Sequence, residues 1–213
     1  MELQFDPSAL APDRTKWTEE RSKISADARA KLKSCLNVPY GRSPRELVDI
    51  FPAGRAGAPV QLFIHGGYWR SGSKDDHSYI ASMLVPAGAI TVVMQYDLCP
   101  HVTVTEIVRQ ARAAIAWTYR HIAEYGGDPT NIYVTGHSAG AHLAAMALAN
   151  DWEKHGLPKN IIKGAVATSG VYDLDPVLHI AVNAEIRLDP ETARKNSPML
   201  HPPQAAAPLL IGV

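Results

Sequence analysis

Apolar residues recur at the spacing of an α-helix in four stretches of the chain. In the clearest of these, Ile107, Ala111 and Ala114 are separated by three or four residues, which places them on one face of a helix. Gly126 follows this stretch, and glycine is the residue most often found just past the end of a helix. The helices that we expect cover residues 15–36, 77–85, 103–125 and 141–150.

Short apolar runs rich in β-branched residues alternate with these helices. The run AITVVMQY at residues 89–96 is almost wholly apolar, as expected for a strand covered on both faces of a sheet. The strands that we expect cover residues 45–51, 59–64, 89–96, 131–135, 163–169 and 209–213. This alternation predicts one α/β domain over residues 1–213, with a mostly parallel central sheet flanked by helices. We expect the irregular, proline-rich residues 175–208 to lie over the edge of the sheet.

The charge balance narrows the range of partners. The 213 residues carry 21 Lys and Arg against 21 Asp and Glu, and no run of one sign is long enough to bind nucleic acid or an anionic membrane surface. The amino terminus lacks the pattern of a secretory signal, and no apolar segment reaches the roughly 20 residues of a membrane span. We therefore expect a cytoplasmic protein. Cys35 and Cys99 lack metal-ligand spacing and are expected to be reduced, half-buried thiols.

A nucleophile motif lies between a predicted strand and a predicted helix. Residues 136–140 read GHSAG, which matches the G-x-S-x-G elbow of serine hydrolases in the strand-to-helix setting that the elbow requires. A sharp turn of this kind strains the backbone at the serine and brings neighbouring backbone too close for side chains, so glycines flank it. We expect Ser138 to be the nucleophile. The alternative is a serine that only caps the helix.

A second motif, HGGYW at residues 65–69, directly follows the strand predicted at residues 59–64. Acyl transfer builds negative charge on the carbonyl oxygen of the substrate, and backbone N–H groups held in a glycine-rich loop stabilise that charge. The loop lies about 70 residues before the elbow, in the position from which such a loop contributes an N–H beside that of Ala139. The alternative is a tight turn with two buried aromatic residues.

The chain resembles the kynurenine formamidase (arylformamidase) group of the hormone-sensitive-lipase-like esterases, which have the α/β-hydrolase fold. The resemblance runs from about Val38 to the last residue and rests on HGGYW, on AWTYRHIAEYGGDPTNIYVTGHSAGAHLAAMALA, on SGVYDLDPVL and on RKNSPML. It implies an oxyanion hole formed by the backbone N–H groups of Gly67 and Tyr68, together with that of Ala139. It implies no cofactor and no metal.

Several further residues are candidates for the site. Trp69 and Tyr172 are candidates for the substrate pocket, although Tyr172 and Asp173 could instead hold a turn. His142 lies four residues after Ser138 on the predicted helix. A side chain at that spacing points along the helix, not across the sheet. We therefore do not expect His142 to be the general base.

The acid and the base of a catalytic triad are not found in residues 1–213. Triads of this fold follow the chain order Ser, Asp or Glu, His, and in the resembling family both partners come after the strand that here reads PLLIGV at residues 208–213. An internal pair such as Asp173 with His201 is the alternative. We expect the fold to lack its carboxyl-terminal strand and helices, and the chain to be truncated or split and catalytically incomplete. The uncovered edge should associate with a second copy or a complementing carboxyl-terminal chain.

The activity that we infer is hydrolysis of a small acyl or formyl compound through an acyl-enzyme on Ser138. By resemblance, the substrate is N-formyl-kynurenine, which would yield kynurenine and formate in tryptophan catabolism. One alternative is a carboxylesterase that acts on short acyl or aryl esters. Another is a non-catalytic fragment that keeps the hydrolase fold and serves as a binding or scaffold protein.

Overall fold

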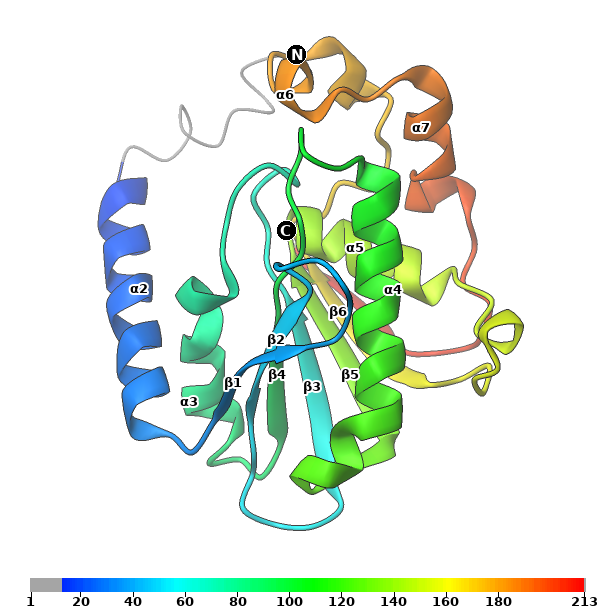
Figure 1. Cartoon of the computed structure of the whole chain (residues 1–213). Helices are drawn as coiled ribbons and strands as arrows, with labels where there is room; N and C mark the ends of the chain where they lie inside the picture. The colour runs from blue at the N-terminus through cyan, green and yellow to red at the C-terminus, as the bar shows by residue number, and fades with distance from the viewer. Residues whose placement is uncertain (1–12, 213) are drawn as a thin grey trace.

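The computed structural model describes residues 13–212 and shows a seven-stranded sheet between layers of helices (Figure 1). The strands follow one another across the sheet in the order β1-β2-β4-β3-β5-β6-β7. The two antiparallel strands β1 and β2 form one edge, and the remaining five strands run parallel. Their bounds are Cys35–Pro39 (β1), Leu47–Phe51 (β2), Ala58–Ile64 (β3), Ile90–Met94 (β4), Gly127–His137 (β5), Ile162–Thr168 (β6) and Leu209–Gly212 (β7).

The helices cover the two faces of the sheet unequally. On one face, α4 (Val104–His121) and α5 (Ala139–Leu148) pack on β3, β5 and β6 and enclose the larger core, which includes Leu62, Val92 and Val134. On the other face, α2 (Arg14–Lys31), η2 (Lys74–Ile80) and α3 (Ala81–Leu84) cover the β2, β4 and β3 side of the sheet. The described elements are completed by η3 (Ile122–Tyr125), η4 (Glu153–His155), η5 (Pro176–His179), α6 (Asn183–Ile186), α7 (Pro190–Lys195) and η6 (Pro198–Leu200).

The sheet is uncovered beside β7. Leu210 and Ile211 are 65% and 56% exposed, although they are large apolar side chains in a strand. Val166 lies directly opposite Leu210 on β6, and Tyr133 lies on the next strand; both are also exposed. Leu210, Val166 and Tyr133 share one face of the sheet and form an exposed apolar surface at the edge where the sequence predicted one, whereas Ile211 lies on the other face. Val213 lies outside the described residues.

The predicted α/β architecture is confirmed, with two corrections. The helix predicted at residues 15–36 ends at Lys31, because Leu32 is already extended (ψ 145°), and residues 35–39 form the edge strand β1. Residues 175–208, predicted over the sheet edge, instead form short helices on the side of α4 and α5, with α7 against α4 and η6 against α5 (Figure 1). Both cysteines are unpaired; Cys35 is half-buried as expected, whereas Cys99 is buried.

One glycine sets how closely α5 approaches the sheet. A β-carbon at Gly140 would lie 2.0 Å from the carbonyl oxygen of Ile64, the last residue of β3. No side chain fits there without moving one of the two backbones. The amino end of α5 therefore lies directly against the end of β3.

We predict that Gly140→Ala destabilises the chain by about 2 kcal/mol or more, because the added methyl group forces α5 away from β3. The direction of the change in the free energy of unfolding is informative, because alanine in place of glycine stabilises a helix by about 1 kcal/mol when there is space. Urea unfolding followed by circular dichroism measures the change.

Gly212→Ala is the matched control, because a β-carbon at that edge position would have its nearest neighbour at 3.7 Å. It should leave the free energy of unfolding almost unchanged. Equal midpoints for Gly140→Ala and the unaltered chain would contradict the close backbone contact.

Candidate active site

Ser138 lies at the sharp turn between β5 and α5. Its backbone has φ 55° and ψ −121°, a left-handed conformation that is rare for a residue with a side chain. The backbone N–H of Ser138 donates to the carbonyl oxygen of Thr168 at the end of β6, with a distance of 2.8 Å. The strained turn that the G-x-S-x-G motif predicted is therefore present, and the neighbouring strand holds it in place.

The glycine-rich loop contacts this turn directly. A β-carbon at Gly66 would lie 2.8 Å from the carbonyl oxygen of His137 and 3.0 Å from Cβ of Ser138. The next three residues all have positive φ, with 120° at Gly67, 48° at Tyr68 and 54° at Trp69. The motifs at residues 65–69 and 136–140 thus form one site at the carboxyl ends of the neighbouring parallel strands β3 and β5.

Two of the predicted oxyanion donors have backbone N–H groups available. Within residues 13–212, the N–H groups of Gly67 and Ala139 donate to no protein acceptor. Ala139 is the first residue of α5, where the N–H groups point out of the helix and the helix dipole favours negative charge. This end of α5 is suited to an oxygen that gains charge.

The ring of His65 fixes the peptide group between Gly66 and Gly67. Nδ1 of His65 lies 2.7 Å from the carbonyl oxygen of Gly66; because a carbonyl only accepts, Nδ1 carries the proton. The ring is fully buried, and burial lowers the pKa of His65 to about 3. His65 is therefore neutral at physiological pH. Since the peptide group is planar and trans, holding the Gly66 carbonyl on one side directs the Gly67 N–H to the other.

Tyr96 supports the same loop through its ring and its hydroxyl group. Its ring stacks on that of His65 with centroids 4.2 Å apart. Its hydroxyl donates to the carbonyl oxygen of His65 at 2.8 Å and approaches that of Gly66 at 3.4 Å. The Tyr96 side chain is fully buried, so the first residues of the loop rest on a rigid aromatic stack.

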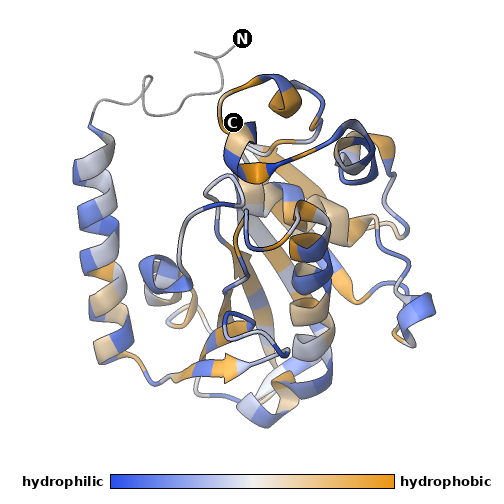
Figure 2. Cartoon of the chain, turned by 45° about the horizontal axis from the view of Figure 1, so that its top comes forward, coloured by the Kyte–Doolittle hydropathy of each residue, from blue (hydrophilic) through white to orange (hydrophobic). Residues whose placement is uncertain are grey.

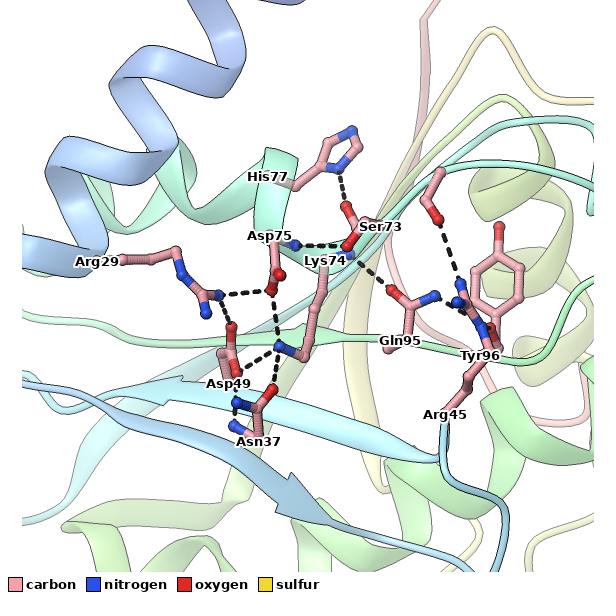
Figure 3. A network of polar contacts seen from close by, with 11 residues as sticks. Arg29, Asn37, Arg45, Asp49, Ser73, Lys74, Asp75, His77, Gln95 and Tyr96 are labelled. Carbon is pink, nitrogen blue, oxygen red and sulfur yellow. Dashed lines mark hydrogen bonds and ion pairs between the residues drawn. The ribbon is translucent and has the colours of Figure 1, made fainter.

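The far end of the loop is held by a buried polar network (Figure 3). Nζ of Lys74 lies 2.9 Å from a carboxylate oxygen of Asp49, and both side chains are almost completely buried. Arg29 of α2 pairs with the other carboxylate oxygen of Asp49. The backbone N–H of Lys74 donates to the side-chain oxygen of Gln95 at 2.7 Å. The loop is thus fixed at both ends.

Trp69 is completely enclosed, and so its side chain supports the loop but offers no surface to a substrate. Its Nε1–H donates to Nδ1 of His142 at 3.1 Å, while Nε2–H of His142 donates to the carbonyl oxygen of Asn196 at 2.7 Å. Burial lowers the pKa of His142 to about 4. Both ring nitrogens of His142 therefore already form hydrogen bonds inside the protein, which confirms that His142 is not positioned as the general base.

Tyr172 lies in the loop that follows β6, the strand that pairs with β5 before Ser138. Its ring packs over Gly170, and its hydroxyl donates to the carbonyl oxygen of Ala167 at 3.4 Å. The side chain is half-buried, so Tyr172 remains a candidate for the substrate pocket.

No histidine of residues 13–212 forms a hydrogen bond with the Ser138 hydroxyl. The internal alternative is not assembled, because His201 contacts the carbonyl oxygen of Arg194 and Asp173 accepts from the backbone of Asp175. The same residues contain no cluster of potential metal ligands. They also contain no helix with the length and apolar composition needed to cross a membrane.

The supporting roles of His65 and Tyr96 were missed by the sequence analysis. His65 was recognised only as part of the motif, and Tyr96 only as the end of a strand. The sequence signal for the contact between them is weak, since 31 residues separate the two positions.

Comparisons with known proteins agree with this geometry. The model of the BD-FAE family matches residues 48–211. Kynurenine formamidase from Danio rerio is 35% identical over 207 residues, which cover 93% of this chain and 69% of that protein. Kynurenine formamidase from Salmo salar is 34% identical over 212 residues, which cover 96% of this chain and 70% of that protein.

Solved structures show the same fold. A protein from a Silicibacter species, proposed to be a thioesterase, superposes with a TM-score of 0.88 at 27% identity, covering 100% of this chain and 80% of that one. An esterase from Pyrobaculum calidifontis superposes with a TM-score of 0.70 at 21% identity, covering 95% and 74%. The chain belongs to the BD-FAE family of α/β-hydrolase esterases and to the kynurenine formamidase group.

Proposed function

We propose that Ser138 is the nucleophile of a hydrolase that cleaves an N-formyl amide. The observation that carries this proposal is the contact between the strained turn at Ser138 and the loop at Gly66. Such a contact places a serine hydroxyl beside backbone donors that do not have to reorganise during the reaction.

In the proposed reaction, Oγ of Ser138 forms a bond to the formyl carbon. The N–H groups of Gly67, Tyr68 and Ala139 stabilise the negative charge that develops on the carbonyl oxygen. The carbon–nitrogen bond then breaks, and the amine leaves with a proton. Water then adds to the formyl-enzyme and the bond between Oγ and the formyl carbon breaks, which releases formate, while a proton from the water restores the Ser138 hydroxyl.

The substrate that we propose is N-formyl-kynurenine. Support comes from the two fish relatives, which are kynurenine formamidases and match more than nine-tenths of this chain. The alternative substrate class is a small acyl or aryl ester, because a solved esterase shares the fold.

A serine hydroxyl needs a base to take its proton, and a positioned imidazole contributes about 10²- to 10⁴-fold to such a reaction. Since no histidine of residues 13–212 is bonded to Ser138, we propose that the imidazole and its carboxylate partner come from outside these residues. The uncovered edge at β7 is a surface on which a complementing segment or second copy could pack.

We predict that Tyr96→Phe lowers kcat about tenfold with little change in KM. Losing the hydroxyl removes its hydrogen bond to the carbonyl oxygen of His65, so the loop that directs the Gly67 N–H towards the developing charge is held less firmly. The measurement is steady-state hydrolysis by the longest form of the protein that its gene encodes.

Tyr40→Phe is the matched control, because Tyr40 is also buried and its hydroxyl also donates to a backbone carbonyl, that of Gln95, at 2.7 Å. Both variants should lose about 1 kcal/mol of stability, whereas only Tyr96→Phe should lose activity. Equal effects on kcat would remove Tyr96 from the positioning of the loop.

We predict that the longest encoded form of the protein hydrolyses N-formyl-kynurenine with a higher kcat/KM than p-nitrophenyl butyrate. In Ser138→Ala, both activities should fall by about 10³-fold or more, because the groups of a catalytic triad act as a unit. The two rates are compared by absorbance assays under identical conditions.

A clear preference for the ester would replace the formamidase proposal with the esterase alternative. If Ser138→Ala kept most of either activity, Ser138 would not be the nucleophile for that substrate.

A further inference from the structure

A cavity lies away from Ser138, lined by residues of α4, the end of α5, α7 and η4. Its volume is about 550 Å³, and residues of α4, α5 and α7 line it. This volume is within the range of sites that hold small molecules. None of the residues assigned to the acyl-transfer site contributes to its lining.

The titratable residues that line this cavity are all basic. Six of its lining residues are basic and none is acidic: Arg109, Arg112, Arg120, His155, Lys195 and His201. Arg109 is neutralised by Glu46 and Glu106, which lie outside the lining. Across residues 13–212, no carboxylate pairs with Arg112, Arg120 or Lys195. The cavity therefore holds uncompensated positive charge.

Arg112 is the cation placed deepest in this cavity. One terminal nitrogen donates to the carbonyl oxygen of Met146 at 3.1 Å, whereas Nε is buried with no acceptor among the described residues. Burial also lowers the pKa of the Arg112 guanidinium. A buried N–H on a cation is costly when it lacks an acceptor, and an anion would supply one.

Apart from Thr105 and Asn196, the rest of the lining is apolar. Val108, Met146 and Trp152 are each 3% exposed. Ala113 and Ala116 complete the side of the cavity formed by α4. Guanidinium groups bind carboxylates through paired hydrogen bonds, whereas an apolar wall favours an aromatic or aliphatic body. A ligand that carries both a carboxylate and an apolar body would therefore match the guanidinium groups and the apolar wall together.

We propose that this cavity binds a small organic anion, an aromatic carboxylate, whose carboxylate pairs with Arg112 and whose ring packs on the half-buried Ala113 and Ala116. The site is separate from the acyl-transfer site, so it goes beyond the proposed hydrolase activity. Its occupant is small because the cavity, lined by residues of this one chain, has a volume of only about 550 Å³.

The test uses 2-naphthoate as the probe and its neutral analogue 2-naphthamide, titrated into the 213-residue chain by calorimetry. We expect 2-naphthoate to bind about tenfold or more tightly than 2-naphthamide, as for a hydrogen bond to a charged group. Labelled alanine methyl groups should report the position, with the largest NMR shifts at Ala113 and Ala116. Added salt should weaken the binding of 2-naphthoate alone.

Arg112→Gln should lower the affinity for 2-naphthoate about tenfold and leave that for 2-naphthamide nearly unchanged. Arg112→Lys keeps the positive charge but loses the planar pair of donors. Its affinity for 2-naphthoate should therefore lie between those of the unaltered chain and of Arg112→Gln. Lys33→Gln removes one positive charge after α2, on the opposite face of the sheet, and should have no effect. Thermal unfolding of each variant checks that it is folded.

Three outcomes would overturn the proposal. The first is equal affinity of the unaltered chain for the two probes, or no binding of 2-naphthoate at millimolar concentration. The second is a folded Arg112→Gln variant that keeps its affinity for 2-naphthoate. The third is methyl shifts confined to residues outside the cavity.

Discussion

The backbone of α5 at Gly140 lies so close to β3 that a β-carbon there would be 2.0 Å from the carbonyl oxygen of Ile64. Because α5 begins directly after Ser138, this contact sets where the serine stands relative to the end of β3. The glycine-rich loop leaves β3 at that same point, and Gly66 then meets the backbone of His137. The nucleophile and the candidate oxyanion donors are therefore brought together by backbone packing that glycine alone allows.

The loop itself is held at both ends by buried polar groups. His65 is neutral because it is fully buried, and its proton lies on the nitrogen that faces the Gly66 carbonyl. At the other end, Lys74 is paired with Asp49 inside the protein. Removing either partner of such a buried pair leaves an uncompensated charge. Both anchors favour one fixed conformation of the loop, which is what preorganised charge stabilisation requires.

The elbow could be predicted from the sequence because its constraint is local: a strained serine, two glycines, a strand before and a helix after. The general α/β pattern could be predicted for the same reason, since periodicity is local. The edge strand β1 could not, because Cys35 and Val38 become a strand only by pairing with Ile50 and Val48 of β2. The contacts of Tyr96 with His65, and the basic cavity beside Arg112, depend on segments that meet only in the folded chain.

The central claim, that Ser138 is an activated nucleophile, is tested most directly by covalent labelling. The longest encoded form of the protein would be treated with a fluorophosphonate, and the modified peptide identified by mass spectrometry. The account predicts one label per chain, on Ser138, appearing in proportion to the loss of hydrolysis of N-formyl-kynurenine. Loss of activity with Ser138 unmodified, or full labelling of Ser138 with activity retained, would contradict it.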